Sequence, residues 1–408
     1  MADTWKAESE AQVVEAVAWA AAESQPLEVV GRASKRGLGR PVQAAHGLDL
    51  SGLSGITLYE PEELVLSARA GTPLAEIAQA LEEKGQQLAF EPPDLGPLLG
   101  QPAGAGSAGG LVACNLAGPR RLKAGAARDH FLGLEAVSGR GESFKSGGRV
   151  VKNVTGYDLC KLLAGSYGTL AAMTQITLKV LPKAEKTRTV LLYGLDDRQA
   201  VAAMTRAVTS SHEVSGAAHL PAGVASELEI AYVGAVGGAV TALRVEGPAP
   251  SAEYRAAALR RELGDLAETE ELHGHNSGRL WQAVGNVEPF VGWDEAVVWR
   301  LSVAPSQAPD VLARLGALKG LSHYCDWGGG LIWLALPSAD DGHHQAVRAA
   351  LGADGGHATL IRAPETVRAA VPVFQPQAPA LAALSQRVKE AFDPHGVLNP
   401  GRMAAGPA

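Results

Sequence analysis

The feature that most constrains this chain is a glycine-rich run at residues 31–39, placed directly after a short apolar stretch at residues 27–30. The stretch predicts a strand, and the run contains too many glycines for regular structure. Glycine tolerates both signs of φ and a close approach of other atoms, so successive N–H groups can point into one concavity. Ser34 can add a hydroxyl there, and Lys35 or Arg36 a positive charge. The run therefore predicts a binding loop for an anionic group such as a diphosphate.

A second glycine-rich segment spans residues 103–118, where eleven of sixteen residues are Gly, Ala or Ser. Leu111, Val112 and Leu116 make it too apolar for a flexible linker, which predicts backbone pressed closely against another part of the molecule. It contains a GxGxxG pattern, but residues 94–102 are rich in Gly and Pro instead of strand-like, so a Rossmann site is not expected. Neither segment matches GxxxxGK[ST], which argues against a nucleoside-triphosphate P-loop.

The composition excludes several classes of protein. A chain of 408 residues exceeds one comfortable core and predicts two domains. No apolar run reaches the ~20 residues that span a bilayer, and residues 1–10 lack the pattern of a secretory signal, so we expect a cytoplasmic protein. The formal net charge of −7 argues against a general nucleic-acid binder. The cysteines at 114, 160 and 325 form no CxxC pair, so no local zinc or iron–sulfur site is expected.

Hydrophobic periodicity predicts the regular elements. The expected strands are residues 27–30, 64–70, 171–181, 190–193, 227–233, 297–303 and 331–336. The expected helices are residues 9–23, 73–84, 254–263, 308–318 and 381–392. Ser9 with Gln12 predicts a capping box for the first helix, and Thr72 is expected to cap the second. The interleaved strands and helices of the second half predict an antiparallel sheet with helices on one face, an α+β arrangement. Residues 393–401 predict an ordered, turn-dense tail.

Four blocks carry a resemblance to a known family. They are residues 30–39, residues 102–118, residues 152–159 followed by 165–170, and residues 392–401. In this order they resemble the FAD-binding domain and C-terminal segment of the vanillyl-alcohol-oxidase (PCMH-type) flavoproteins. The AGPRR sequence at 117–121, the block at 152–159 and the overall length are most similar to the FAD-binding subunits of bacterial glycolate oxidases.

The resemblance implies an α+β fold in three parts. A PCMH-type FAD-binding domain of two subdomains is expected at residues 1–183. An α+β, ferredoxin-like cap domain is expected at residues 187–380, with the boundary at 182–186. Residues 381–408 are expected to form a helix and tail that pack back on the FAD-binding domain.

The resemblance also implies the residues that hold FAD. In the family the first loop wraps the diphosphate, the second glycine segment passes close to the diphosphate and flavin, a third stretch closes the cradle, and an asparagine of the tail lies near the isoalloxazine ring. The matching positions are Gly31, Arg32, Ala33, Ser34, Lys35, Gly37, Leu38, Gly39, Pro102, Ser107, Gly109, Gly110, Asn115, Gly156, Gly165, Ser166, Gly168, Thr169, Ile176 and Asn399. Members with covalent flavin often use a histidine in the first loop. This loop has none, so non-covalent FAD is expected.

The implied activity is that of an FAD-dependent oxidoreductase acting on a CH–OH donor. The implied role is the FAD-binding subunit of a glycolate oxidase complex, with a catalytic flavoprotein subunit and an iron–sulfur subunit as partners and a small 2-hydroxy acid as substrate. The family motif resembling GHxGDGNxH is eroded at residues 322–333, where His323 is the positional candidate for a general base. Two alternatives stay open: a stand-alone FAD-dependent D-2-hydroxy-acid dehydrogenase, and a non-catalytic flavin-binding structural subunit.

Three further groups of residues have open interpretations. The basic cluster Arg120, Arg121, Lys123 and Arg128 is either a solvated loop or a surface that faces flavin phosphates or a partner subunit. His273 and His275 form an HxH pair without a third ligand at recognisable spacing, so no metal site is expected. The tryptophans of the second half predict packing in the cap core or at a subunit interface; they are Trp281, Trp293, Trp299, Trp327 and Trp333.

Overall fold

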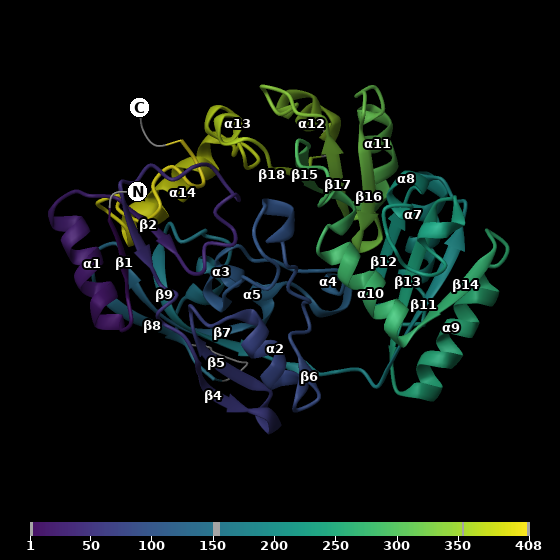
Figure 1. The fold of residues 1–408 in the computed structure, drawn as a ribbon, viewed down its shortest axis with the longest axis horizontal. Helices are drawn as coiled ribbons and strands as arrows, with labels where there is room; N and C mark the ends of the chain where they lie inside the picture. Colours follow the sequence, from purple (N-terminus) through teal and green to yellow (C-terminus); the bar gives the residue numbers. More distant parts are fainter. Residues whose placement is uncertain (1–2, 150–155, 353–354, 406–408) are drawn as a thin grey trace. The chain divides into compact units, whose positions relative to one another are not determined.

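A computed structural model describes residues 3–149, 156–352 and 355–405 of the chain (Figure 1). Contacts divide it into two compact units. Unit 1 comprises Met1–Leu116, Ala126–Pro182 and Pro372–Ala408, and unit 2 comprises Ala117–Gly125 and Lys183–Val371. This grouping differs from the predicted domain division at residues 117–125, which belong to unit 2, and at residues 372–380, which belong to unit 1. The predicted division otherwise stays a prediction.

The N-terminal part of unit 1 is a small parallel sheet with one helix. Strands β1 (Asp3–Lys6), β3 (His46–Asp49) and β2 (Leu27–Val30) lie in that order, and α1 (Glu10–Ala22) follows β1. The predicted cap of α1 is confirmed in its first half, because Ser9 Oγ accepts a hydrogen bond from the Gln12 amide. The second half is wrong, because Gln12 Oε1 accepts from the amide of Glu8 instead of Ser9. The helix buries Val13, Val17 and Ala20.

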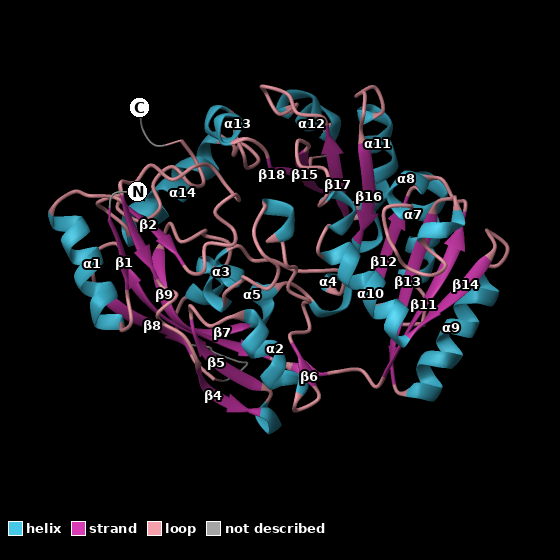
Figure 2. Cartoon of the chain, viewed as in Figure 1, coloured by secondary structure: helices cyan, strands magenta, loops and turns pink. Residues whose placement is uncertain are grey.

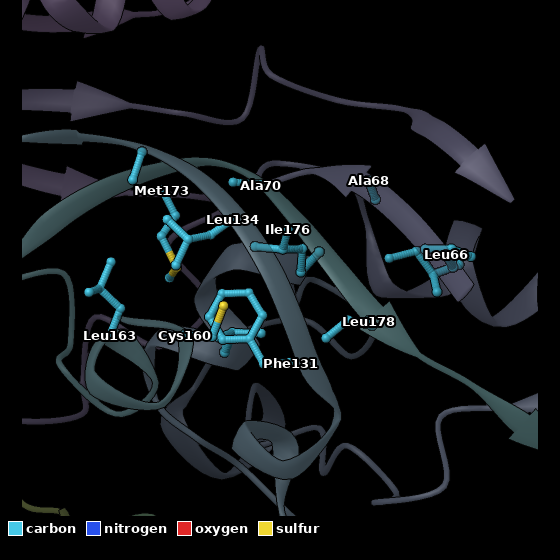
Figure 3. Packing of buried hydrophobic residues seen from close by; sticks show 14 of the residues in the cluster. Leu66, Ala68, Ala70, Phe131, Leu134, Cys160, Leu163, Met173, Ile176 and Leu178 are labelled. Atoms are coloured by element: carbon cyan, nitrogen blue, oxygen red, sulfur yellow. The ribbon is translucent and has the colours of Figure 1, made fainter. Parts of the chain in front are cut away.

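The larger part of unit 1 is a five-stranded antiparallel sheet. Its order is β4 (Ile56–Glu60), β5 (Val65–Arg69), β9 (Ala171–Lys179), β7 (Phe131–Ser138) and β8 (Ser143–Gly147). Helices α2 (Leu74–Glu82), α3 (Ala108–Ala113) and α6 (Leu159–Leu163) contribute to one core with the inward residues of the strands. Helix α5 (Ala127–His130) places Ala127 in a separate small cluster with Phe90 and Leu111. Phe131, Cys160 and Ile176 are among the buried residues of this core (Figure 3). This packing fixes the strand ends on which the binding loops are mounted.

Two local predictions for unit 1 are off at their ends. Helix α2 begins at Leu74, with Pro73 at the cap position. Thr72 does not cap it, because its hydroxyl accepts from the Gly55 amide and donates to the Arg69 carbonyl. The predicted strand 171–181 ends at Lys179, and residues Leu181–Pro182 form a separate short strand, β10, paired with β6 (Gln86–Gln87).

Unit 2 is built on an eight-stranded antiparallel sheet, as the sequence predicts. Its order is β14 (Thr269–His273), β11 (Lys186–Tyr193), β13 (Val240–Gly247), β12 (Gly216–Leu220), β16 (Ser322–Asp326), β17 (Leu331–Leu336), β15 (Val297–Ser302) and β18 (His357–Arg362). Figure 2 shows these strands with the helices of unit 2 around them. The longer helices are α7 (Asp197–Val208), α9 (Ala249–Leu263), α10 (Gly274–Gly285), α11 (Ala308–Leu315) and α12 (His344–Leu351).

The predicted strand at residues 227–233 is wrong. Helix α8 (Ala222–Ala225) leads into turns and a short 3-10 helix, Gly234–Val236. The side chains of Leu228, Ile230 and Val233 are buried, as they would be in a strand. The backbone, however, forms hydrogen bonds with residues close by in the sequence. The Ile230 amide donates to the Leu228 carbonyl, and the Gly234 amide donates to the Ile230 carbonyl. Turn hydrogen bonds thus satisfy the groups that a strand would have paired across a ladder.

The C-terminal part contains α13 (Glu365–Ala370) in unit 2 and α14 (Pro379–Phe392) in unit 1. The helix predicted at 381–392 is therefore confirmed and begins two residues earlier. None of the helices in the described ranges combines the length and the apolar character needed to span a bilayer.

Candidate cofactor site

Unit 1 contains a cavity of about 720 Å³, a volume that includes open solvent at its mouth. Its walls come from the loop after β2, the glycine segment at α3, the turn before β9 and the C-terminal tail. The lining residues are Val29, Val30, Gly31, Arg32, Ala33, Ser34, Lys35, Arg36, Leu50, Ala70, Ser107, Gly109, Gly110, Ala113, Cys114, Tyr167, Gly168, Ala171, Met173, Asn399 and Arg402. Apolar walls with a small number of polar and charged groups are typical of ligand pockets, so this cavity is the candidate cofactor site.

The first loop lies tightly against the second glycine segment. A Cβ added to Gly31 would lie only 2.4 Å from Ser107 Oγ, so no larger residue fits there without movement. Ser107 in turn caps α3, where its hydroxyl accepts from the Gly110 amide at 3.4 Å. Ala33 adopts a left-handed backbone conformation, with φ of 58°, which lets the loop turn between Gly31 and Lys35. The two predicted binding segments thus form one continuous wall.

Gly109 has a packing role that the sequence does not reveal. A Cβ added there would lie 2.8 Å from Ala70 Cβ, and the Gly109 amide donates to the Ala70 carbonyl at 2.8 Å. The absent side chain allows α3 to approach the end of β5 closely. That approach brings Ala70 and Gly109 together on the cavity wall.

The C-terminal tail closes the cavity from the far end of the sequence. Asn399 Oδ1 accepts from the Val29 amide at 2.7 Å, and its Nδ2 donates to the Tyr167 carbonyl at 2.8 Å. The Asp393 carboxylate accepts from the amides of Val397 and Leu398, which fixes the turn that presents Asn399. The tail therefore joins β2 to the turn before β9.

The cavity wall is electrostatically positive. Lys35 Nζ donates to Ser34 Oγ at 3.3 Å, and Arg402 Nη1 donates to the carbonyls of Arg36 and Arg40 at 2.9 and 3.3 Å. Burial lowers the pKa of the Lys35 ammonium and that of the Arg402 guanidinium. Burial also raises the pKa of the Cys114 thiol, which keeps that group neutral.

The structure brings ten of the predicted FAD-binding residues together on this wall. They are Gly31, Arg32, Ala33, Ser34, Lys35, Ser107, Gly109, Gly110, Gly168 and Asn399. The other ten do not line it in the described residues; they are Gly37, Leu38, Gly39, Pro102, Asn115, Gly156, Gly165, Ser166, Thr169 and Ile176. Their assignment to the cofactor stays a prediction.

Several of these ten support the wall from behind. Ile176 is fully buried in the sheet core, where it pairs with Ala68 and Leu134. The Gly165 amide donates to the Val112 carbonyl, and Thr169 Oγ1 donates to the Ser166 carbonyl at 2.7 Å. These contacts hold the turn that carries Gly168. Pro102 and Gly156 are exposed, and residues 152–155 of the third block lie outside the described residues.

The basic cluster finds partners within unit 2. Arg120 forms an ion pair with Glu246 at 2.6 Å, and Lys123 forms one with Glu213 at 3.2 Å. Arg121 lies over the Trp327 ring, 4.7 Å from its centroid. Neighbouring Arg244 and Arg120 hold the pKa of the Glu246 carboxyl at about 2, against the effect of its burial. The interpretation as a solvated loop is thus wrong for Arg120, which is mostly buried in this pair.

His323 lies on β16 in unit 2 and has a carboxylate partner. Its Nε2 lies 3.0 Å from Asp197 Oδ1, and His219 Nε2 approaches the same oxygen at 3.6 Å. His273 lies beside Glu271, with Nε2 3.4 Å from Oε1. In the described ranges, no group of three or more His, Cys, Asp or Glu residues is arranged to hold a metal ion. The catalytic assignment of His323 stays a prediction.

The predicted packing of the tryptophans holds for three rings inside unit 2. Trp281 Nε1 donates to Thr189 Oγ1, Trp299 Nε1 to the Gly342 carbonyl and Trp327 Nε1 to the Gly118 carbonyl. All three are buried, so they serve the core of the unit.

The sequence analysis missed several residues of the cavity. Cys114, Tyr167 and Arg402 line it, and each lies within or beside a block that was recognised as a whole. Tyr167 adopts φ of 53°, a conformation that its neighbour Gly168 shares at 70°. A basic residue directly after the NPG sequence of the tail was the signal available for Arg402.

Comparisons with known proteins agree with this geometry. A family model described as an FAD binding domain matches residues 4–147. The chain is 35% identical over 394 residues to glycolate oxidase subunit GlcE of Escherichia coli (strain K12), covering 96% of this chain and 97% of that protein. It is 34% identical over 139 residues to glycolate oxidase subunit GlcD of Bacillus subtilis (strain 168), covering 34% of this chain and 28% of that protein.

Solved structures show the same fold. The chain superposes on 4-ethylphenol oxidase from Gulosibacter chungangensis with a TM-score of 0.75 at 14% identity, covering 99% of this chain and 89% of that one. Against p-cresol methylhydroxylase the TM-score is 0.72 at 14% identity, covering 99% and 88%. The predicted PCMH-type, α+β fold is confirmed.

The residues of the cavity fit FAD. Leu50, Ala70, Ala171 and Met173 give part of the wall an apolar character suited to a flavin ring or an adenine. The loop at 31–35 adds backbone groups and the charge of Lys35, which suit the anionic centre of the cofactor. Gly31, which has no side chain, lets the first loop lie directly against Ser107 at this part of the wall.

Proposed function

Because this chain belongs to the FAD-binding family of the glycolate oxidase subunit GlcE, we propose that it carries FAD in a glycolate-oxidising complex. In this proposal glycolate becomes glyoxylate, and the electrons leave through an iron–sulfur subunit to an acceptor such as quinone. A catalytic flavoprotein subunit is the other partner. The complex is cytoplasmic, and its partners hold this chain at the inner face of the cell membrane.

The observation that carries the proposal is the cavity of unit 1 together with the length of the match. The cavity is formed entirely within one unit, from segments at 29–36, at 107–114, at 167–173 and in the tail. The similarity to the GlcE subunit covers 96% of this chain and 97% of that protein, so it extends over nearly the whole sequence. Flavin binding is therefore supported by the same residues that relate the chain to its family.

The chain's own residues position the cofactor. When bound, FAD supplies the acceptor for the hydride of the α-carbon. The backbone of the first loop and the glycine segment bind its polar centre, and the apolar wall excludes water from part of the cavity. Asn399 keeps the β2 end and the Tyr167 turn at a fixed separation through its hydrogen bonds.

We propose that the cofactor is held without a covalent bond. Of the described residues that line the cavity, none is a histidine. Cys114 is the thiol there, and the raised pKa that its burial causes leaves it a poor nucleophile at neutral pH.

His323 is the candidate base for removal of the hydroxyl proton. Its contact with Asp197 is the kind of carboxylate contact that orients a histidine ring. The replacement His323→Asn tests this role by the rate of flavin reduction. A rate equal to that of the wild type removes His323 from the chemistry and assigns the histidine to the structure of unit 2.

The experiment that tests the function is an absorption spectrum of the purified chain before and after acid precipitation, followed by anaerobic addition of glycolate. Flavin that moves to the supernatant and bleaches with glycolate supports a catalytic subunit with non-covalent FAD. The same titration on the assembled complex separates the alternatives. Bleaching in the complex alone indicates that a partner supplies the substrate site, and bleaching of the isolated chain indicates independent catalysis. Flavin that stays oxidised in both contradicts a role in glycolate oxidation and favours a structural subunit.

A further inference from the structure

We propose that Lys35 and Arg402 form a cation pair that holds the diphosphate of FAD, so that this chain recognises its cofactor through side-chain charge as well as backbone amides. The inference rests on FAD being the cofactor. It assigns a role to Arg402 and distinguishes the two cations from the other basic residues of the cavity.

The two side chains reach the same cavity from opposite ends of the sequence. Lys35 belongs to the first loop and extends along the glycine segment: its Nζ lies 3.7 Å from where a Cβ of Gly106 would be and 3.6 Å from that of Gly110. Arg402 belongs to the tail and lines the same cavity, and both cations act on the Cys114 thiol. An anion placed between the loop and the glycine segment would lie within the field of both.

Gly39 leaves the space that the Arg402 side chain occupies beside the first loop. A Cβ at Gly39 would lie 2.8 Å from Arg402 Cδ and 3.1 Å from the Arg402 carbonyl oxygen, and the glycine has φ of 80°. Arg402 Nη1 donates to the carbonyls of Arg36 and Arg40, which anchors one edge of the guanidinium to the loop. An arginine carries five N–H donors, so the rest of the group can serve a ligand. Gly39 thus leaves room for Arg402, and its own contact with the cofactor stays a prediction.

Neither cation has a direct carboxylate partner among the residues that the structure describes. Within the described part of the chain, neither Lys35 nor Arg402 forms an ion pair with an acidic side chain. Arg36 in the same loop differs, because it forms an ion pair with Glu28. Arg32 also lines the cavity, but it is exposed to water.

The acidic groups nearest the cations are already engaged. Asp94, which acts on Lys35, accepts hydrogen bonds from the amides of Gly96 and Gly104. Glu28, which acts on Arg402, pairs with Arg36. Cys114 faces both cations and is neutral as a thiol. Buried charge without a counter-ion is costly, and two positive charges match the two negative charges of a diphosphate.

Binding of three flavins to the apo-protein tests the pair. FAD and FMN carry phosphate and riboflavin does not, and quenching of flavin fluorescence measures each dissociation constant. We expect Lys35→Met and Arg402→Met each to weaken FAD binding by about 10- to 100-fold, the range of a charge-assisted hydrogen bond. Riboflavin binding should not change, and ADP as a competitor should weaken in parallel with FAD. Lys84→Met, which removes an exposed cation of the same unit, is the matched control.

A second variant separates the loss of the Arg402 charge from the loss of its hydrogen bonds to the loop. Arg402→Lys keeps the charge but cannot reproduce the contacts with both carbonyls. FAD affinity within a few-fold of the wild type in Arg402→Lys supports the role of charge. An equal loss in Arg402→Lys and Arg402→Met assigns the effect to the tail and overturns the pair.

Two further outcomes are distinguishable. If both methionine variants bind FAD as the wild type does, or if they lose riboflavin as strongly as FAD, the diphosphate assignment is wrong. If the wild-type apo-protein itself binds no FAD, the cofactor assignment fails, and the cation pair fails with it.

Discussion

The side chain of Asn399 accepts a 2.7 Å hydrogen bond from the backbone amide of Val29, a residue 370 positions earlier in the chain. The Nδ2 of the same side chain donates to the Tyr167 carbonyl at 2.8 Å. Asn399 has φ of 45°, a conformation that asparagine tolerates better than most residues. One tail residue therefore determines the separation of two walls of the cofactor cavity.

Replacement of this residue should loosen both walls. We expect Asn399→Ala to lower the free energy of unfolding by about 1 to 3 kcal/mol, because it leaves a donor and an acceptor of half-buried residues without their partner. FAD affinity should fall as well. Urea unfolding and a flavin titration measure the two effects, with the exposed Gln386→Ala on α14 as a control. Unchanged stability would show that water replaces the amide without loss.

Gly31 and Ser107 should behave as a coupled pair. Gly31→Ala places a Cβ 2.4 Å from Ser107 Oγ, whereas the Ser107 Cβ is 3.4 Å away, an ordinary contact. We expect Gly31→Ala alone to weaken FAD binding and to destabilise the protein by about 1 to 3 kcal/mol, as overpacking does. Adding Ser107→Ala should restore part of this loss, although it removes a helix cap worth about 1 kcal/mol. Purely additive effects in the double-mutant cycle would contradict the predicted clash.

The Arg120–Glu246 ion pair should matter for stability and not for the cofactor. Both side chains are largely buried, and removing one partner of such a pair typically costs about 3 kcal/mol. Arg120→Met should therefore lower the unfolding free energy by about that amount and leave the dissociation constant of FAD unchanged. Lys123→Met, in the exposed pair with Glu213, is the matched control and should have little effect. A weaker affinity for FAD in Arg120→Met would return the basic cluster to the phosphate hypothesis.

His219 should make unit 2 sensitive to acid. Burial lowers the pKa of this histidine from 6.5 to about 4, because it disfavours the imidazolium more than Asp197 favours it. Between these values the unfolded state binds the extra proton, so stability is complete above pH 6.5 and falls as the pH drops towards 4. The loss should total about 3 kcal/mol.

Denaturant unfolding at pH 7 and at pH 5 measures this slope. His219→Gln keeps a hydrogen-bonding group next to Thr241, with which His219 Nδ1 shares a 2.9 Å contact, and removes the titration. The variant should lose most of the pH dependence in this range. The His323 and His219 rings lower the pKa of the Asp197 carboxyl. Stability should therefore fall a second time as the pH drops below the pKa of unfolded aspartate. An unaltered slope in His219→Gln would place the acid sensitivity elsewhere.

Glycine spacing and hydrophobic periodicity in the sequence determined much of the fold. Of the twenty residues predicted to bind FAD, ten line the cavity. Glycines at 31, 106, 109 and 168 occur where the structure brings backbone or side chains into close contact, and their spacing is visible in the sequence itself. Helix α1, strands β2, β9 and β17 and the antiparallel sheet of unit 2 follow from hydrophobic periodicity, which reports burial directly.

The tertiary structure alone decided which distant groups meet. The pattern of residues 227–233 is that of a strand, but turn hydrogen bonds satisfy the backbone there instead of bonds to a neighbouring strand. Nothing near Arg120 in the sequence reveals Glu246, and nothing near Lys35 reveals Arg402. Periodicity and glycine spacing act over a few residues and are written into the sequence. By contrast, a charge can be neutralised by a protein carboxylate or be available to a ligand. Which of the two holds depends on which segments pack together, and these segments can be hundreds of residues apart in the sequence.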